Sequence, residues 1–217
     1  MSTKPTKYIG TDDDWEIATS SLKNSLTELN IPFATANGEG AFYGPKIDLH
    51  AKDAIGRRWQ LSTIQIDFAQ PDNFDIEYVN SENKKVRPVM IHRAPFGSME
   101  RFCGVLIEHF NGMFPTWLSP TQVHILTISE KHKNYAEKIA RTLHELAIRV
   151  EMDTGDDTIG KKLRTHRSMR PAYLMILGDD EQNNGTVSFM GPDREQNTGI
   201  SLEQFILSIT TEINSKV

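Results

Sequence analysis

The chain has 217 residues, of which 38% are hydrophobic and 24% charged, and it carries a formal net charge of −5. This composition is typical of a globular protein and excludes a disordered chain, while the negative charge gives no general signal for nucleic-acid binding, which requires local Lys and Arg. We expect no membrane partner, because no apolar run approaches the roughly 20 residues that a membrane helix needs. The polar first residues show no secretory signal, and the single cysteine, Cys103, fits a cytoplasmic protein.

The first half of the chain predicts an antiparallel sheet with helices. Residues 15–29 predict an amphipathic helix, with Thr11 and three aspartates suited to its N-cap and first turn. Strand patterns follow at 41–53 and 57–68, joined by a hairpin-type turn at 53–56. Two more strands are expected within 74–94, joined by the polar loop 80–84, and then a helix over about 98–110.

The second half predicts a compact α/β unit with a mostly parallel mixed sheet. Pro115 and Pro120 lie in a polar and aromatic connector, "NGMFPTWLSPTQ", which divides the chain into domains at 1–118 and 119–217. Asp156 or Asp157 is the expected N-cap of the second helix, and Ser201 that of the last. The expected strands are 123–128, 149–153, 173–177 and 186–190, and the expected helices are 134–146, 158–169 and 201–213.

Polar side chains gather in two stretches of the first half. Because alternate residues of a strand face the same side, Thr63, Gln65 and Asp67 share one face, which could form the floor of a site for a polar ligand. Taken alone, this pattern is explained more simply by a solvent-exposed face of an antiparallel sheet, which is commonly polar. In "PVMIHRAPFGSMERF", His92 and Arg101 flank a strand-to-helix junction. Together the two stretches favour a site for an anionic, hydrogen-bonding substrate.

Three segments carry a specific resemblance. "GEGAFYGPKID", "RRWQLSTIQIDF" and "RPVMIHRAPFGSMERF" resemble, in this order, the C-terminal part of the catalytic core of threonyl-tRNA synthetases, and "GSMERF" is similar to motif 3 of the class II aminoacyl-tRNA synthetases. The second half resembles the anticodon-binding domain of that family. The resemblance implies α+β and then α/β architecture. It also implies a ligase that activates threonine with ATP and Mg²⁺ and transfers it to threonine tRNA.

The resemblance also implies roles for individual residues. Arg101 matches the motif 3 arginine that contacts ATP phosphate, and Lys46 matches a lysine near the reaction centre. Gln60 and Thr63 match contacts to adenosine. Tyr43 and Gln65 match residues of the threonine pocket. His92 matches one of three ligands of a Zn²⁺ ion that, in the family, recognises the amino and hydroxyl groups of threonine.

Other family features are expected outside this sequence. These are motif 1 with its homodimer interface, motif 2, the editing domain, and the cysteine and first histidine of the zinc site. Cys103 does not match the ligand cysteine. The chain alone is therefore expected to be inactive and to need the missing N-terminal part of the synthetase. The alternative is a non-catalytic paralogue that acts as an RNA- or protein-binding module.

The tRNA-binding half shows one expected contact surface and two departures from the family. Basic side chains along residues 161–167 are expected to meet RNA phosphates, with a solvated helix face as the alternative; they are Lys161, Lys162, Arg164 and Arg167. Met190 and Gly191 stand where the family tends to carry arginines, and "RSMRPAY" departs from a more usual lysine-valine-proline run. The sequence therefore predicts RNA binding with modest discrimination of the anticodon.

Overall fold

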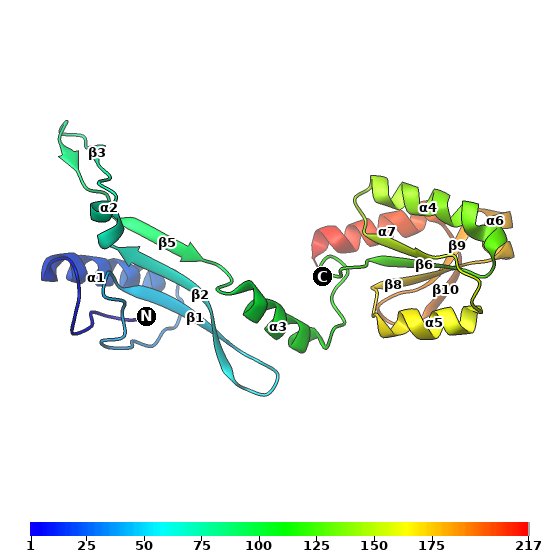
Figure 1. Cartoon of the computed structure of the whole chain (residues 1–217), viewed down its shortest axis with the longest axis horizontal. Helices are drawn as coiled ribbons and strands as arrows, with labels where there is room; N and C mark the ends of the chain where they lie inside the picture. Colours follow the sequence, from blue (N-terminus) through cyan, green and yellow to red (C-terminus); the bar gives the residue numbers. More distant parts are fainter. Residues whose placement is uncertain (217) are drawn as a thin grey trace. The chain divides into compact units, whose positions relative to one another are not determined.

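The computed structural model describes residues 1–216, which form two compact units that divide between His109 and Phe110 (Figure 1). The division lies nine residues before the boundary expected from the connector prolines. The connector itself explains the difference, because Thr116 is buried and donates a hydrogen bond to Glu212, and Gln122 donates to the carbonyl of Thr116. The end of the connector is thus part of the second unit.

The first unit contains a three-stranded antiparallel sheet in the order β1-β2-β5. Its elements are α1 (Asp12–Glu28), β1 (Lys46–Lys52), β2 (Arg58–Asp67), α2 (Ala69–Asn73), β3 (Tyr78–Val79), β4 (Lys85–Val86), β5 (Met90–Ala94) and α3 (Met99–Phe110). The predicted turn at 53–56 joins β1 to β2, where the backbone N–H of Gly56 bonds the carbonyl of Asp53. We conclude that the antiparallel arrangement expected from the sequence is confirmed.

Helix α1 forms where the sequence predicts it, and its cap is the predicted one. The Thr11 side chain accepts from the backbone of Asp14, and the Asp14 side chain accepts from the backbone of Thr11, which is a capping box. Ala18 and Leu22 of α1 are buried against Ile66 of β2. One face of the sheet is therefore covered by α1 (Figure 1).

The structure corrects the sequence prediction for residues 74–94. The loop at 80–84 does join two strands, β3 and β4, but these form a separate two-residue hairpin. Pro88 then separates β4 from β5, because proline has no N–H to continue a ladder. The short helix α2 was not predicted, since five residues are too few to show a helical period.

The second unit has a five-stranded mixed sheet in the order β10-β9-β8-β6-β7. Strand β6 is parallel to both β7 and β8, whereas β9 is antiparallel to β8 and to β10. Its elements are β6 (Val123–Thr127), a 3-10 turn (Glu130–His132), α4 (Lys133–Glu145), β7 (Val150–Asp153), α5 (Ile159–Ser168), β8 (Tyr173–Leu177), α6 (Asp179–Asn184), β9 (Thr186–Met190), β10 (Gln196–Ser201) and α7 (Leu202–Ser215).

Two caps of the second unit were predicted, one of them wrongly. Ser201 caps α7 as expected, accepting from the backbone of Gln204. Helix α5 is capped by Thr158, which accepts from Lys161, and not by Asp156 or Asp157. Helix α6 and strand β10 were not predicted. Both are short or polar, and neither shows a clear hydrophobic period.

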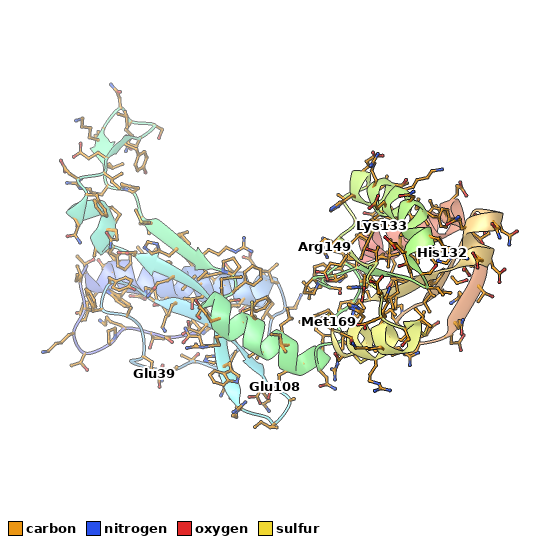
Figure 2. The ribbon with its side chains drawn as sticks, turned by 45° about the vertical axis from the view of Figure 1, so that its right-hand side comes forward. Glu39, Glu108, His132, Lys133, Arg149 and Met169 are labelled. Atoms are coloured by element: carbon orange, nitrogen blue, oxygen red, sulfur yellow. The ribbon has the colours of Figure 1, made fainter. Side chains whose placement is uncertain are left out.

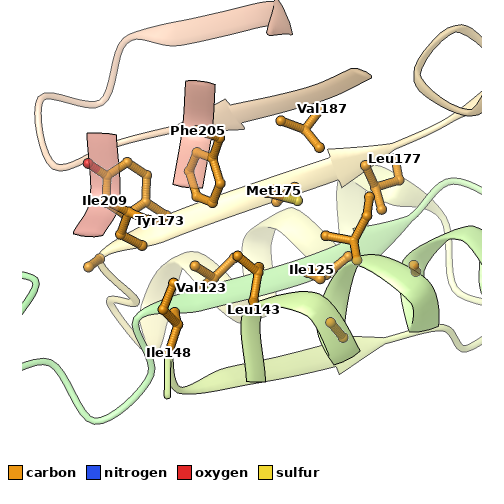
Figure 3. Packing of buried hydrophobic residues seen from close by; sticks show 14 residues of the cluster. Val123, Ile125, Leu143, Ile148, Tyr173, Met175, Leu177, Val187, Phe205 and Ile209 are labelled. Atoms are coloured by element: carbon orange, nitrogen blue, oxygen red, sulfur yellow. The ribbon is translucent and has the colours of Figure 1, made fainter. Parts of the chain in front are cut away.

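A dense hydrophobic core lies between the sheet of the second unit and the helices α4 and α7 (Figure 3). Leu143 of α4 and Phe205 and Ile209 of α7 are buried against β6 and β8. Helix α5 lies on the opposite face of the sheet (Figure 1). Over residues 1–216, no helix combines the length and the apolar character that crossing a membrane demands.

Candidate active site on the polar face of the first sheet

The face of the β1-β2-β5 sheet opposite α1 carries most of the predicted site residues. Antiparallel pairing aligns Lys46 of β1 with Gln65 of β2, and Gln65 with His92 of β5. The next row on the same face aligns Asp48 with Thr63. Residues far apart in the sequence thus meet in two adjacent cross-strand rows, as the alternation of β2 predicted.

A β-bulge in β2 adds Gln60 to this face. Leu49 pairs with Ser62 but His50 pairs with Gln60, so Leu61 has no partner across the ladder. In a regular strand Gln60 and Thr63, three residues apart, would face opposite sides. The extra residue reverses the alternation, and Gln60 donates to the Thr63 hydroxyl at 3.1 Å. No pattern in the sequence predicted this bulge.

Asp48 connects three of the predicted residues and was not itself predicted as a site residue. Its Oδ1 accepts from Gln60 Nε2 at 2.6 Å and from Thr63 Oγ1 at 2.8 Å, and its Oδ2 lies 2.8 Å from Lys46 Nζ. Burial would raise the pKa of the Asp48 carboxyl, but the bonds from Lys46 and Thr63 outweigh burial and lower it. Asp48 is therefore ionised at neutral pH. Its position one step from Lys46 on the same face was the signal for it.

His92 is held by a second carboxylate, that of Asp67, which the sequence placed on the polar face without a role of its own. Its Nε2 lies 2.8 Å from Oδ2 of Asp67, which is 2% exposed. Burial would raise the pKa of the Asp67 carboxyl, but bonds from the Gln70 N–H, His92 and the Ala69 N–H lower it. With Nε2 engaged, Nδ1 is the ring nitrogen left for a metal, which is the arrangement of carboxylate-backed histidine ligands.

A complete metal site is not formed by the described part of the chain. Residues 1–216 contain no group of three His, Cys, Asp or Glu side chains placed to hold one ion. Zinc sites in proteins normally use three or four protein ligands. Cys103 is an exposed free thiol on α3. The residues present therefore supply His92 as a single donor and do not by themselves fit Zn²⁺.

Tyr43 joins the same face from the segment before β1. Its hydroxyl donates to Gln65 Oε1 at 3.2 Å. The backbone of this segment continues the ladder, because Phe68 donates to the carbonyl of Tyr43 at 2.9 Å. Gly44 allows the approach, since a Cβ at this residue would lie 1.7 Å from the carbonyl oxygen of Ile66. A side chain at Gly44 would thus displace Tyr43 from Gln65.

Arg101 reaches the sheet from the first turn of α3. The Ser98 hydroxyl accepts from the Arg101 N–H at 3.3 Å, which places Arg101 at the start of the helix. Its guanidinium donates to the carbonyl of Gln60 at 3.1 Å and lies 5.7 Å from the Trp59 ring centroid. Gly97, with a φ of 65°, passes close to the carbonyl of Leu61. Arg101 and Gln60 are thereby neighbours.

Arginines and an aromatic ring also line an open cavity of about 460 Å³ beside α3. Arg57 and Arg101 both lie near the Trp59 ring, and Glu108 of α3 (Figure 2) lies 3.5 Å from Arg57. Asp53 anchors this group by accepting from Arg57 and from the Trp59 indole. Burial opposes ionisation of Asp53, but the bonds from Trp59 and Arg57 lower its pKa to about 2.

The basic residues of the second unit are only partly as expected. Lys161, Arg164 and Arg167 are exposed on α5, although Lys161 pairs with Asp157 at 2.8 Å. Lys162 was predicted to meet RNA phosphate, and this is wrong. It is 1% exposed and donates to the carbonyl of Thr127 at 2.9 Å. At the edge of α5, Arg167 contacts the sulfur of Met190.

Comparison with known proteins supports this division of the chain. Residues 10–110 match the family "tRNA synthetase class II core domain (G, H, P, S and T)", and residues 122–212 match the family "Anticodon binding domain". The chain is 48% identical over 216 residues to a threonine–tRNA ligase of Caldanaerobacter subterraneus subsp. tengcongensis, and 46% identical over 217 residues to one of Clostridium tetani. Each match covers the whole chain but 34% of the relative, so the chain spans about one third of the length of these enzymes.

One solved structure is similar to this chain in both fold and sequence. It is a crystal structure of the RNA-binding domain of threonyl-tRNA synthetase from Cryptosporidium parvum Iowa II. The TM-score is 0.88 at 38% identity, over 97% of this chain and 54% of that one. Together with the two family matches, this shows that the chain belongs to the class II tRNA synthetases, as a segment of the catalytic core joined to an anticodon-binding domain.

Proposed function

We propose that these residues supply part of the adenylate-forming site and the tRNA-contacting domain of a threonine–tRNA ligase. Such an enzyme activates threonine with ATP and transfers it to threonine tRNA. The observation that carries the proposal is the single polar sheet face that brings together Lys46, Gln60, Thr63, Gln65 and His92. It lies in a chain that resembles threonine–tRNA ligases over its whole length.

In this proposal the nucleotide lies at the end of the face nearest α3. Gln60 and Thr63 bind the adenosine part of ATP, and the adjacent Arg101 binds its phosphates together with Mg²⁺. A guanidinium beside the phosphates stabilises the charge that develops as pyrophosphate leaves. Lys46 lies one row away from Thr63 and supplies a further positive charge near the reacting groups, although Asp48 partly neutralises it.

Threonine occupies the end of the face that carries Tyr43 and Gln65. These two side chains are already hydrogen-bonded to each other, which fixes the position of both polar groups. His92 is one zinc ligand, oriented by Asp67, and residues outside this chain supply the other ligands. The second unit binds the tRNA, and we place the assembled homodimeric enzyme in the cytoplasm.

A chimeric enzyme tests this function. Residues 1–217 replace the matching third of the Clostridium tetani threonine–tRNA ligase, and threonine-dependent ATP–pyrophosphate exchange and charging of threonine tRNA are measured. We expect both activities, with serine and valine as poor substrates. We also expect Arg101→Ala to lower the exchange rate about 100-fold, by analogy with the loss of one oxyanion donor. A folded chimera that is inactive beside an active parent would overturn the proposal.

The 217-residue chain by itself provides a matched second arm. We expect it to form no threonyl-adenylate and to retain no stoichiometric zinc after dialysis, because the described residues contain no group of three side chains placed to hold one metal ion. Exchange activity of the chain alone would contradict the first expectation. Bound zinc that is lost on His92→Ala would contradict the second.

The competing function is that of a non-catalytic RNA- or protein-binding module. Altered RNA contacts are indicated by Met190 and Gly191, which replace the arginines typical of the family, and by the departure in "RSMRPAY". The chimera distinguishes the two functions. A chimera that binds threonine tRNA but neither exchanges nor charges would favour the module.

A further inference from the structure

One carboxylate organises the part of the polar face that is proposed to bind the nucleotide. Asp48 contacts Lys46, Gln60 and Thr63 at once, at distances between 2.6 and 2.8 Å. These three residues come from two strands, and Gln60 reaches the carboxylate only because of the bulge at Leu61. The convergence is therefore a product of the fold, and Asp48 is its centre.

The chemistry of a carboxylate determines how Gln60 is oriented. An ionised carboxylate has no proton to donate, so the group of Gln60 that faces Asp48 must be the amide nitrogen. The same nitrogen also lies 3.1 Å from the Thr63 hydroxyl oxygen. Both of its hydrogens are thus directed into the protein. The carbonyl oxygen Oε1 of Gln60 has no such partner among the hydrogen bonds that hold this cluster, and it remains able to accept.

The ion pair with Lys46 strengthens this arrangement. Both side chains are largely buried, and the ammonium group lies against Oδ2, the oxygen that Gln60 and Thr63 do not use. Hydrogen bonds to a charged group are stronger than neutral ones, and leaving such a group without partners is costly. A neutral residue at this position would release Lys46 and allow the Gln60 amide to rotate.

We infer that Asp48 is a positioning residue of the nucleotide site, which holds Gln60 with its carbonyl oxygen free to accept a hydrogen bond from an N–H or O–H group of the nucleotide. The inference deepens the proposed function and rests on it for the identity of the ligand. Asp48 does not touch the nucleotide. It fixes the orientation of the Gln60 amide, so that the amide presents its carbonyl oxygen and this part of the face is complementary to a hydrogen-bond donor.

The first test uses the 217-residue chain and needs no enzymatic activity. The NMR signals of the Gln60 side-chain NH₂ group are assigned by comparison with Gln60→Glu, and their exchange with solvent is measured. We expect slow exchange in the parent chain and exchange at least tenfold faster in Asp48→Ala and in the nearly isosteric Asp48→Asn. The control is Asp12→Asn, an exposed carboxylate on α1 that should leave the Gln60 signals unchanged.

The second test measures kinetics in the chimeric enzyme. Asp48→Asn should raise KM for ATP about tenfold and leave KM for threonine within about twofold, because the threonine side is held by other contacts. A merely structural defect would change both KM values and the unfolding midpoint together. Fast exchange of the Gln60 NH₂ in the parent, or an unchanged KM for ATP in Asp48→Asn, overturns the inference. If the parent chimera is inactive, the proposed function fails and the exchange measurement still decides the role of Asp48.

Discussion

The two units of this chain differ in how completely they bury their apolar side chains. In the second unit, α4 and α7 close one face of the sheet, and fourteen buried residues form one continuous cluster (Figure 3). In the first unit the sheet cluster consists of three buried residues, Ala18 and Leu22 of α1 and Ile66 of β2. Helix α3 has no buried residue, although its apolar residues recur with a helical period. An amphipathic pattern thus identifies the apolar face of a helix and does not reveal what covers it.

The two units also differ in whether their hydrogen-bonded polar residues are exposed or buried. In the first unit the polar side chains lie on an open sheet face and bond one another, as His92 does with Asp67 and Gln60 with Asp48. In the second unit the inner side of α5 is polar, and the buried residues of that helix are Lys162 and His166. Similar residue types therefore form an accessible hydrogen-bonded face in one unit and are packed beneath a helix in the other.

The largest expected effect tests the contrast in packing. Phe205→Ala removes a side chain that is 1% exposed in the core of the second unit, and we expect a loss of about 3–5 kcal/mol in the free energy of unfolding. Ile107→Ala on α3, at 53% exposure, should change that free energy by less than about 0.5 kcal/mol. Urea unfolding followed by circular dichroism measures both. Equal losses would mean that α3 is packed in solution.

The next effect separates two adjacent lysines of α5. Lys162→Met removes a buried hydrogen bond to the Thr127 carbonyl and should cost about 2 kcal/mol, because that acceptor is left unsatisfied. Lys161→Met breaks an exposed pair with Asp157 and should cost less than about 0.5 kcal/mol. A reversed order of the two unfolding midpoints would contradict the burial of Lys162.

In RNA binding, loss of the exposed basic side chains of α5 should have a larger effect than loss of the buried Lys162. In the chimera, alanine at Lys161, Arg164 and Arg167 should weaken binding of threonine tRNA and reduce the slope of log K against log salt by about 2, if each side chain contacts one phosphate of single-stranded RNA. A salt titration of tRNA binding measures the slope. Lys162→Met should leave the slope unchanged, since its ammonium group is not exposed. An unchanged slope in the triple variant would exclude this helix face as the RNA surface.

The smallest expected effect is a pH dependence of the local stability of α5. The imidazole rings of His124 in β6 and His166 in α5 stack with centroids 3.9 Å apart. Burial, and then the charge of His166, lower the pKa of His124 below its usual value of 6.5, although Glu151 and Asp153 act in the opposite direction. His166 is itself paired with Asp153 at 2.7 Å, and Lys162 lies 3.8 Å from the same carboxylate.

The sign of the dependence follows from the lowered pKa. The folded protein favours neutral His124, so its contribution to stability is present above pH 6.5 and is lost as the pH falls below that value. We expect amide hydrogen exchange in residues 159–168, corrected for its intrinsic pH dependence, to become faster between pH 7 and pH 5.5. His124→Leu should reduce this change, and His144→Asn, at an exposed histidine of α4, should not. The same change in His124→Leu would assign the effect to another group.

The sequence by itself determined the local features of this protein. Thr11 and Ser201 cap their helices because a hydroxyl needs only the backbone N–H three residues later, and both were predicted correctly. The alternation of Thr63 and Gln65 in β2 likewise needs only the pleat of the strand, and it identified the polar face. The family resemblance then implied binding roles for individual residues, among them Thr63 and Gln65.

The tertiary structure decided which neighbours these residues meet. The bulge at Leu61 depends on the pairing of β2 with β1, and it moves Gln60 to the face where Asp48 can hold it. Lys162 is buried because the Thr127 carbonyl lies beneath α5, a fact of packing that the charge pattern of the helix does not contain. Caps and periods arise from bonds within a few residues, whereas register and burial arise from contacts between distant segments, so only the folded chain shows them.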